Sequence, residues 1–153
     1  MASRIPTIYR FWFTQLDPFL TIIGIFCNFF APNFLLAGLN PTYQSPPTSE
    51  TILLLDTGGA WFIAILILQL GLLRSRPNDV LVWRYYAAAV GTVDTIVCAA
   101  ILRALNAQGR LGFDAWRSEE WVNFGSTAAC AVVRIALVLG VGIDDRLDKM
   151  KGV

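Results

Sequence analysis

Histidine is missing from this chain of 153 residues, and charged residues are scarce. Without histidine, the sequence argues against acid–base catalysis by imidazole, histidine-ligated haem and histidine clusters that bind iron. Only 15% of the residues are charged, whereas soluble domains have about 25%. Together with a hydrophobic content of 56%, this scarcity predicts an integral membrane protein.

Cysteine is also sparse. The three cysteines lie far apart inside apolar runs and form no CxxC motif, which argues against disulfide exchange and against a thiolate zinc site. We therefore predict neither a metal site nor a cofactor. The net charge of +1 and the lack of a basic arm give no basis for nucleic-acid binding.

Four apolar segments are each long enough to cross a bilayer, which takes about 20 residues. They cover approximately residues 11–31, 52–73, 82–105 and 121–143. A Pro/Ser/Thr-rich stretch separates the first two, and a short RSRPND connection predicts that the second and third form an antiparallel hairpin. The sequence thus predicts an all-α fold, an integral membrane four-helix bundle that forms a single domain over residues 1–153.

The basic residues predict how the spans are oriented. With four spans, both termini and the 74–79 connection lie on one side of the membrane, and that side carries most of the Lys and Arg residues. The other side carries Arg103, Arg110 and Arg117. By the positive-inside rule, both termini of this multi-pass protein face the cytoplasm, and we expect it in the endoplasmic reticulum.

Each span contains one ionisable residue well inside it: Asp17, Asp56, Asp94 and Arg134. Such residues cost about 2.5–3.5 kcal/mol each on insertion scales, face the bundle interior and mark functional sites. Their depths, counted along the helices, pair Asp94 with Arg134 near the middle of the membrane. Asp17 precedes a proline, so its alternative role is to cap or kink its helix.

Three carboxylates then share a single arginine. Arg134 can offset one of them, and the others must reach water or bind a proton, because burial disfavours the charged form. A carboxylic acid kept neutral is a proton donor. Asp56 has no basic residue at its depth and is the first candidate donor, and Asp94 is the second, if Arg134 turns elsewhere.

Small and polar residues line up with these charges at helical spacing, for example Ala87, Gly91, Asp94 and Cys98 in the third span. Such stripes serve either close helix packing or the lining of a ligand cavity, and the sequence leaves both open. Aromatic residues near the span ends either anchor the helices at the membrane interface or shape a substrate pocket. The candidate substrate-binding residues are Trp61, Trp83, Tyr86, Trp121, Asn123 and Thr127.

A series of short motifs follows the spans in order: Tyr9-Arg10, Leu16-Asp17-Pro18, Trp83-Arg84, Asp94, Trp116, Trp121, Arg134 and Leu139-Gly140-Val141-Gly142. In their order and spacing, the chain resembles a family of small four-span fungal membrane proteins of unknown function that occur in secondary-metabolite pathways. These proteins look like smaller counterparts of the membrane-bound meroterpenoid cyclases. The resemblance implies buried acidic residues that protonate an epoxide or an alkene. The four-helix sterol isomerases are a looser comparison, because their acid–base set includes a histidine.

Three functions follow from these patterns. The first is an intramembrane acid–base enzyme, a cyclase or isomerase without a cofactor, acting on a lipophilic natural-product intermediate such as a polyketide or terpenoid. The second is a non-enzymatic lipid- or metabolite-binding protein or an accessory membrane subunit. The third is a proton-coupled transporter, which with four spans would require a homo-oligomer. The expected partners are a lipophilic small molecule and membrane lipids.

Overall fold

The computed structural model describes residues 5–143, which form only helices and the connections between them. Four of the helices are long and apolar enough to cross a membrane: Thr7–Phe30, Ser49–Leu73, Val80–Ala107 and Ser118–Val138. The all-helical fold and the four apolar helices are therefore confirmed. The last helix ends five residues before the predicted position 143, because Gly140 and Gly142 take positive φ angles of 78° and 74° and turn the chain.

Two of the four spans are interrupted by a π-helical turn. The first span consists of α1 (Thr7–Phe11), the π-helical turn η1 (Trp12–Leu16) and α2 (Asp17–Phe30). The second consists of α4 (Ser49–Ile67) and the π-helical turn η2 (Leu68–Leu73). The third and fourth spans are the continuous helices α5 (Val80–Ala107) and α6 (Ser118–Val138). Short helices α3 (Pro32–Leu39) and η3 (Phe113–Ala115) lie in the connections.

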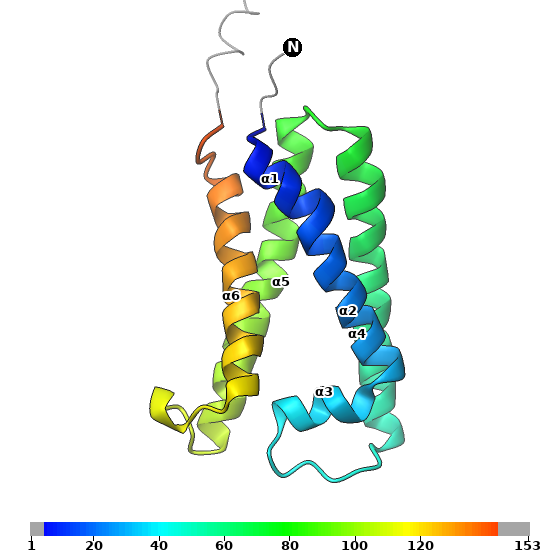
Figure 1. Cartoon of the computed structure of the whole chain (residues 1–153), viewed down its shortest axis with the longest axis vertical. Coiled ribbons are helices and arrows are strands. Elements are labelled where there is room, and N and C mark those ends of the chain that lie inside the picture. The colour runs from blue at the N-terminus through cyan, green and yellow to red at the C-terminus, as the bar shows by residue number, and fades with distance from the viewer. Residues whose placement is uncertain (1–4, 144–153) are drawn as a thin grey trace, which may run out of the picture.

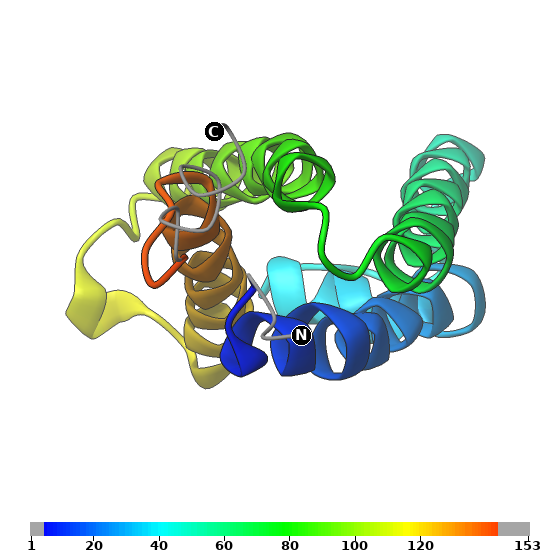
Figure 2. The ribbon, with the colours of Figure 1, turned by 90° about the horizontal axis from the view of Figure 1, so that it is seen from above.

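The spans pack as two pairs, α2 with α4 and α5 with α6 (Figures 1 and 2). The first and last described residues lie at the same end of the molecule, which we call the terminal end (Figure 1). There η1 contacts η2, and η2 contacts α5. At the opposite end, which we call the loop end, α3 runs crosswise from α2 and contacts α6. The two pairs are thus joined at both ends of the molecule.

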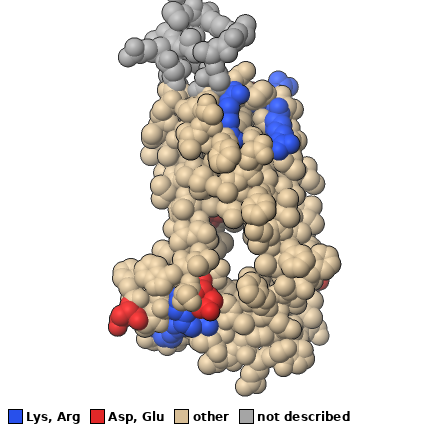
Figure 3. Space-filling model, in the orientation of Figure 1, with Lys and Arg blue, Asp and Glu red and all other residues tan. Residues whose placement is uncertain are grey.

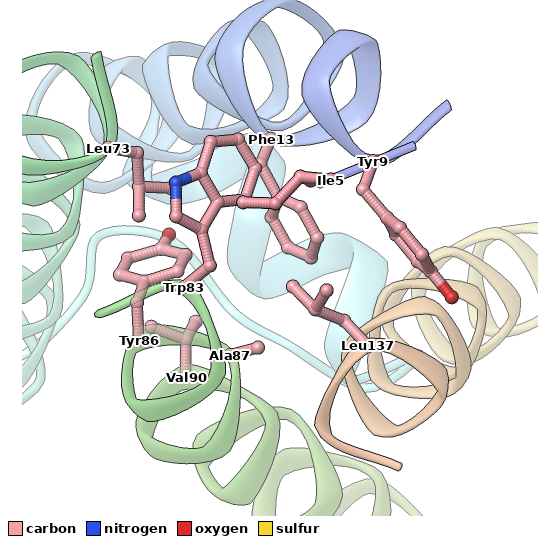
Figure 4. Packing of buried hydrophobic residues seen from close by; sticks show 9 residues of the cluster. All are labelled: Ile5, Tyr9, Phe13, Leu73, Trp83, Tyr86, Ala87, Val90 and Leu137. Carbon is pink, nitrogen blue, oxygen red and sulfur yellow. The ribbon is translucent and has the colours of Figure 1, made fainter. Parts of the chain in front are cut away.

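The buried hydrophobic core lies at the terminal end (Figure 4). The ring of Phe13 from η1 meets the rings of Trp83 and Tyr86 from α5 edge to face, at centroid distances of 6.1 and 6.0 Å. Trp83 is 1% exposed, and its indole N–H donates to the carbonyl of Arg76 over 2.9 Å. Trp83 therefore belongs to the packed junction of the two pairs. Its position near a span end suggests an anchor at the membrane interface instead.

The outer surfaces of the helices are apolar. Large hydrophobic side chains such as Phe30 and Leu54 are exposed by 74% and 73%, as expected of residues that face lipid. On the face drawn in Figure 3, the basic side chains gather at the two ends of the molecule and leave the middle free of them. This distribution fits four helices that cross a membrane, because an uncompensated charge is costly at mid-bilayer.

Gly91 allows α5 and α6 to approach closely in the middle of their contact. A Cβ atom added at Gly91 would lie 3.2 Å from the Cβ of Arg134, which is tighter than ordinary packing. The small residue on the α5 stripe therefore has a packing role beside the charged residue that it faces.

We expect Gly91→Leu to lower the free energy of unfolding by about 1–3 kcal/mol, because the larger side chain overpacks the α5–α6 contact. Unfolding of the purified protein in mixed micelles, followed by circular dichroism during titration with a denaturing detergent, measures the change. Ala89→Leu is the matched control, because Ala89 is exposed on the same helix. Equal stability of the two variants would contradict the assignment.

Candidate functional site

Arg134 of α6 binds two carboxylates that come from different spans. Its Nη2 donates to Asp17 Oδ1 and Oδ2 over 2.8 and 2.6 Å, and its Nη1 donates to Asp94 Oδ2. The side chains of Arg134 and Asp17 are each 4% exposed, whereas that of Asp94 is 16% exposed. The structure thus contains the pair of Asp94 and Arg134 that the depths of the residues predict, and it adds Asp17.

The helix start at Asp17 does not use the aspartate as a cap. Asp17 is the first residue of α2, directly after the π-helical turn η1, and Pro18 follows in the first turn. No side chain caps this helix start, because the Asp17 carboxylate is bound to Arg134. The alternative that Asp17 only caps its helix is therefore wrong in this structure. A π-helical turn changes the direction of the side chains that follow it and is common at functional sites.

Three further polar side chains surround the carboxylates. The Thr21 hydroxyl donates to the Asp17 carbonyl over 2.8 Å and lies 3.3 Å from Gln69 Oε1. Gln69 is fully buried in η2, and Tyr86 on α5 is 5% exposed and interacts electrostatically with Asp17 and Arg134. We call these six residues the polar cluster: Asp17, Thr21, Gln69, Tyr86, Asp94 and Arg134.

The polar cluster contains donors with no partner among the described residues. Tyr86 Oη, Gln69 Nε2 and Arg134 Nε are buried and make no hydrogen bond. Buried polar groups are normally satisfied, and those that are not often have a functional role. The cluster thus has unused hydrogen-bonding capacity beside its two carboxylates.

Gln69 is the cluster member that the sequence argument overlooks. It is the one strongly polar residue between Gly58 and Leu73 in the second span. A search for ionisable residues alone ignores a neutral amide, although an amide buried in a span needs partners for the same reason as a charge. That signal would have found Gln69.

Asp56 does not join the polar cluster. It lies on α4, is exposed, and makes no hydrogen bond or ion pair within the described part of the chain. Gly59, one turn further along α4, is buried against the ring of Phe29 on α2. The structure thus brings together Asp17, Asp94 and Arg134, and it leaves Asp56 on the surface of the outer pair.

The candidate substrate-binding residues are dispersed. Trp83 and Tyr86 are buried at the terminal end, whereas Trp61 on α4 is 69% exposed. At the loop end, the ring of Trp121 contacts those of Phe113 and Trp116. The remaining two lie on the inner stripe of α6: Asn123 lines a cavity, and the Thr127 hydroxyl donates to the Asn123 carbonyl over 2.8 Å.

That cavity has a volume of about 310 Å³ and lies between α3, α5 and α6. Figure 3 shows the molecule hollowed between its two helix pairs beside α3. The cavity wall is mostly apolar, with residues of α5 from Val97 to Leu105, and its polar lining residues are Gln108, Glu120 and Asn123. Asp94 precedes Val97 by three residues, so it lies one helical turn beyond the lining on the same face of α5.

No group of three or more Cys, Asp and Glu side chains among residues 5–143 is arranged to hold a metal ion. The two carboxylates that do meet are occupied by the Arg134 guanidinium. What this arrangement offers chemically is a carboxylate pair with a fixed cation, next to an apolar cavity.

We expect Arg134→Met to lower the free energy of unfolding by about 3–5 kcal/mol, because it leaves two buried carboxylates without their cation. The triple variant with Asp17→Leu and Asp94→Leu should recover most of this loss, since an apolar replacement of the whole group removes the unpaired charges. Detergent unfolding titrations of the three proteins measure both effects. A triple variant as unstable as Arg134→Met alone would contradict this account.

A family model described as a domain of unknown function (DUF7704) matches residues 2–144 of the chain. No curated protein and no solved structure shows significant similarity. The match runs from the first span to the turn after the last one, so it includes every residue of the polar cluster and of the cavity wall. The chain therefore belongs to the DUF7704 family of domains of unknown function.

Proposed function

We propose that this protein is an intramembrane acid–base enzyme, a cofactor-independent cyclase or isomerase that acts on a lipophilic natural-product intermediate such as a polyketide or terpenoid. The observation that carries the proposal is the binding of two carboxylates, Asp17 and Asp94, to the buried guanidinium of Arg134. The choice of substrate follows from the resemblance of the sequence motifs to small four-span fungal membrane proteins, which look like smaller counterparts of the meroterpenoid cyclases.

The charges of the site favour one bound proton. With all three groups ionised, one arginine and two aspartates carry a net charge of −1. A net charge is costly to bury, and two neighbouring carboxylates favour a proton on one of them. Asp17 has both oxygens on the guanidinium and remains its ionised partner. Asp94, with one contact and the larger exposed fraction, carries the proton that is transferred.

The proposed reaction conserves atoms. The Asp94 carboxylic acid donates its proton to an alkene carbon or an epoxide oxygen of the substrate, and Arg134 stabilises the carboxylate that forms. The carbocation that results is attacked by a second double bond or rearranges. A neighbouring carbon then loses a proton to the Asp94 carboxylate, which restores the acid. Substrate and product are isomers, so the reaction needs no net oxidant or reductant.

Asp56 remains the alternative donor that the sequence suggests. Its exposed position on α4 separates it from Arg134, so it has no cation that would stabilise the carboxylate left after proton transfer. The two candidates therefore make opposite predictions for the same conservative substitution.

We expect Asp94→Asn to abolish product formation while leaving the fold intact, because asparagine fills the same space and cannot donate the proton. Metabolite profiles of the encoding organism with the wild-type and the Asp94→Asn alleles test this. The variant should accumulate a lipophilic compound of the same elemental formula as the product it lacks. Asp56→Asn is the matched control and should leave the profile unchanged.

Other outcomes of this comparison identify the competing functions. Loss of product in Asp56→Asn alone would transfer the donor role to that residue. Profiles unchanged in both variants, with the protein present at normal levels, would overturn the enzyme and favour a binding or accessory subunit. An unaltered compound that only changes compartment would indicate a transporter.

We also propose that both termini face the cytoplasm and that the protein resides in the endoplasmic reticulum, on the distribution of basic residues between the two ends of the spans. A fluorescent protein fused to either terminus should be accessible to protease after selective permeabilisation of the plasma membrane. A fusion protected at either terminus would contradict this orientation.

A further inference from the structure

The cavity at the loop end is elongated along α5. Its lining residues on this helix are Val97, Ala100, Ile101, Ala104, Leu105 and Gln108. They recur every three to four positions and so form one face of the helix. At about 1.5 Å per residue, the lining from Val97 to Gln108 extends over about 16 Å.

The polar end of the cavity offers a neutral binding group. The Glu120 carboxylate is already engaged there, because Arg110 and Arg117 both donate to it over 2.6–3.0 Å. Two other donors of Arg117 bind the carbonyls of Ala37 and Gly38. The Asn123 side chain makes no hydrogen bond within the described residues. Its amide is therefore free to donate to, and accept from, a ligand.

α3 forms part of the cavity wall. Gly38 and Leu39 line it, and Arg117 holds this segment against α6 through the two carbonyls. A Cβ atom at Gly38 would lie 3.8 Å from Asn123 Nδ2. Gly38 thus lies close to the Asn123 amide, and the cavity volume of about 310 Å³ is close to the lower limit of about 300 Å³ for ligand pockets.

We propose that this cavity binds a linear, single-chain lipophile with a neutral polar head, such as an alcohol. The head hydrogen-bonds to Asn123, the chain lies along α5, and the far end of the chain reaches Asp94. The inference rests on the proposed function for the reacting end, and it specifies the shape and polarity of the substrate. A two-chain phospholipid and a fused-ring sterol are both larger than a cavity of about 310 Å³ can enclose.

Photolabelling of the purified protein in nanodiscs tests the site without a turnover assay. We use two long-chain fatty alcohols, one with a diazirine beside the hydroxyl and one with a diazirine at the far end of the chain. The first should label residues near Gln108 and Asn123, and the second should label residues near Asp94 and Val97. Labelling of the same peptide by both probes would overturn the proposed orientation.

Variants within α5 show whether the label enters this cavity. Ala100→Leu fills the middle of the lining and should lower labelling by about tenfold. Ala99→Leu, the adjacent exposed residue on the same helix, is the matched control and should not change it. Equal labelling of the two variants would overturn the site. Asn123→Ala should remove the preference for the alcohol over a diazirine-bearing alkane of the same length, and a preference that persists would overturn the role of Asn123.

Two further probes test the chemical class. A photoreactive sterol should label the cavity weakly. Native mass spectrometry should detect no phospholipid that is bound to the wild-type protein and lost from Ala100→Leu. Strong sterol labelling, or such a phospholipid, would overturn the proposal of a single-chain ligand.

The two proposals fail separately. Asp94→Asn should retain full labelling by both alcohols, because Asp94 acts on the ligand after binding. Full labelling with unchanged metabolite profiles in Asp94→Asn would contradict the proposed enzyme and still support the binding site. Loss of the isomeric product in that variant, with no specific labelling, would support the enzyme and contradict the cavity as its substrate site.

Discussion

The structure depends on a buried guanidinium that binds two carboxylates. Arg134 on α6 contacts Asp94 on its neighbour α5 and Asp17 on α2, which belongs to the other helix pair. The side chains of Arg134 and Asp17 are 4% exposed and that of Asp94 is 16% exposed, so each carboxylate depends on the guanidinium and the guanidinium depends on the carboxylates. The contact therefore fixes the position of one helix pair relative to the other at the level of the polar cluster.

The hydrophobic core and the short helix α3 join the two helix pairs at opposite ends of the molecule. At the terminal end, aromatic rings from η1 and α5 fill the junction of the two pairs. At the loop end, the junction is made by α3, whose carbonyls Arg117 binds. The apolar cavity lies beside the loop-end junction, where Ala100 and Ala104 of α5 alternate with larger apolar side chains. Along α5, the core residues at the terminal end are thus followed by the charged Asp94 and then by the cavity lining.

The sequence predicts the spans and the pair of Asp94 and Arg134 because both depend on local composition and on depth, which counting residues can measure. It does not predict that Asp17 joins them, because that contact depends on how two helix pairs dock, and no periodicity within one span encodes it. The exposed position of Asp56 escapes prediction for the same reason. Its spacing from Gly59 places both residues on one face of a helix, yet Gly59 is buried and Asp56 is exposed. Gln69 escapes a search for ionisable residues because its amide is neutral, although an amide is also costly to bury in an apolar span.

The π-helical turns η1 and η2 each place one additional residue in a span. An additional residue rotates everything beyond it by about 100° around the helix axis. Tyr9, Phe13, Asp17 and Thr21 are all buried although they recur at every fourth position, a spacing that drifts around a regular α-helix, and the additional residue in η1 offsets that drift. Removing a single residue from η1 would restore a regular helix and turn the buried residues on one side of it towards lipid. In these two spans, the exact number of residues is constrained as strongly as their identity.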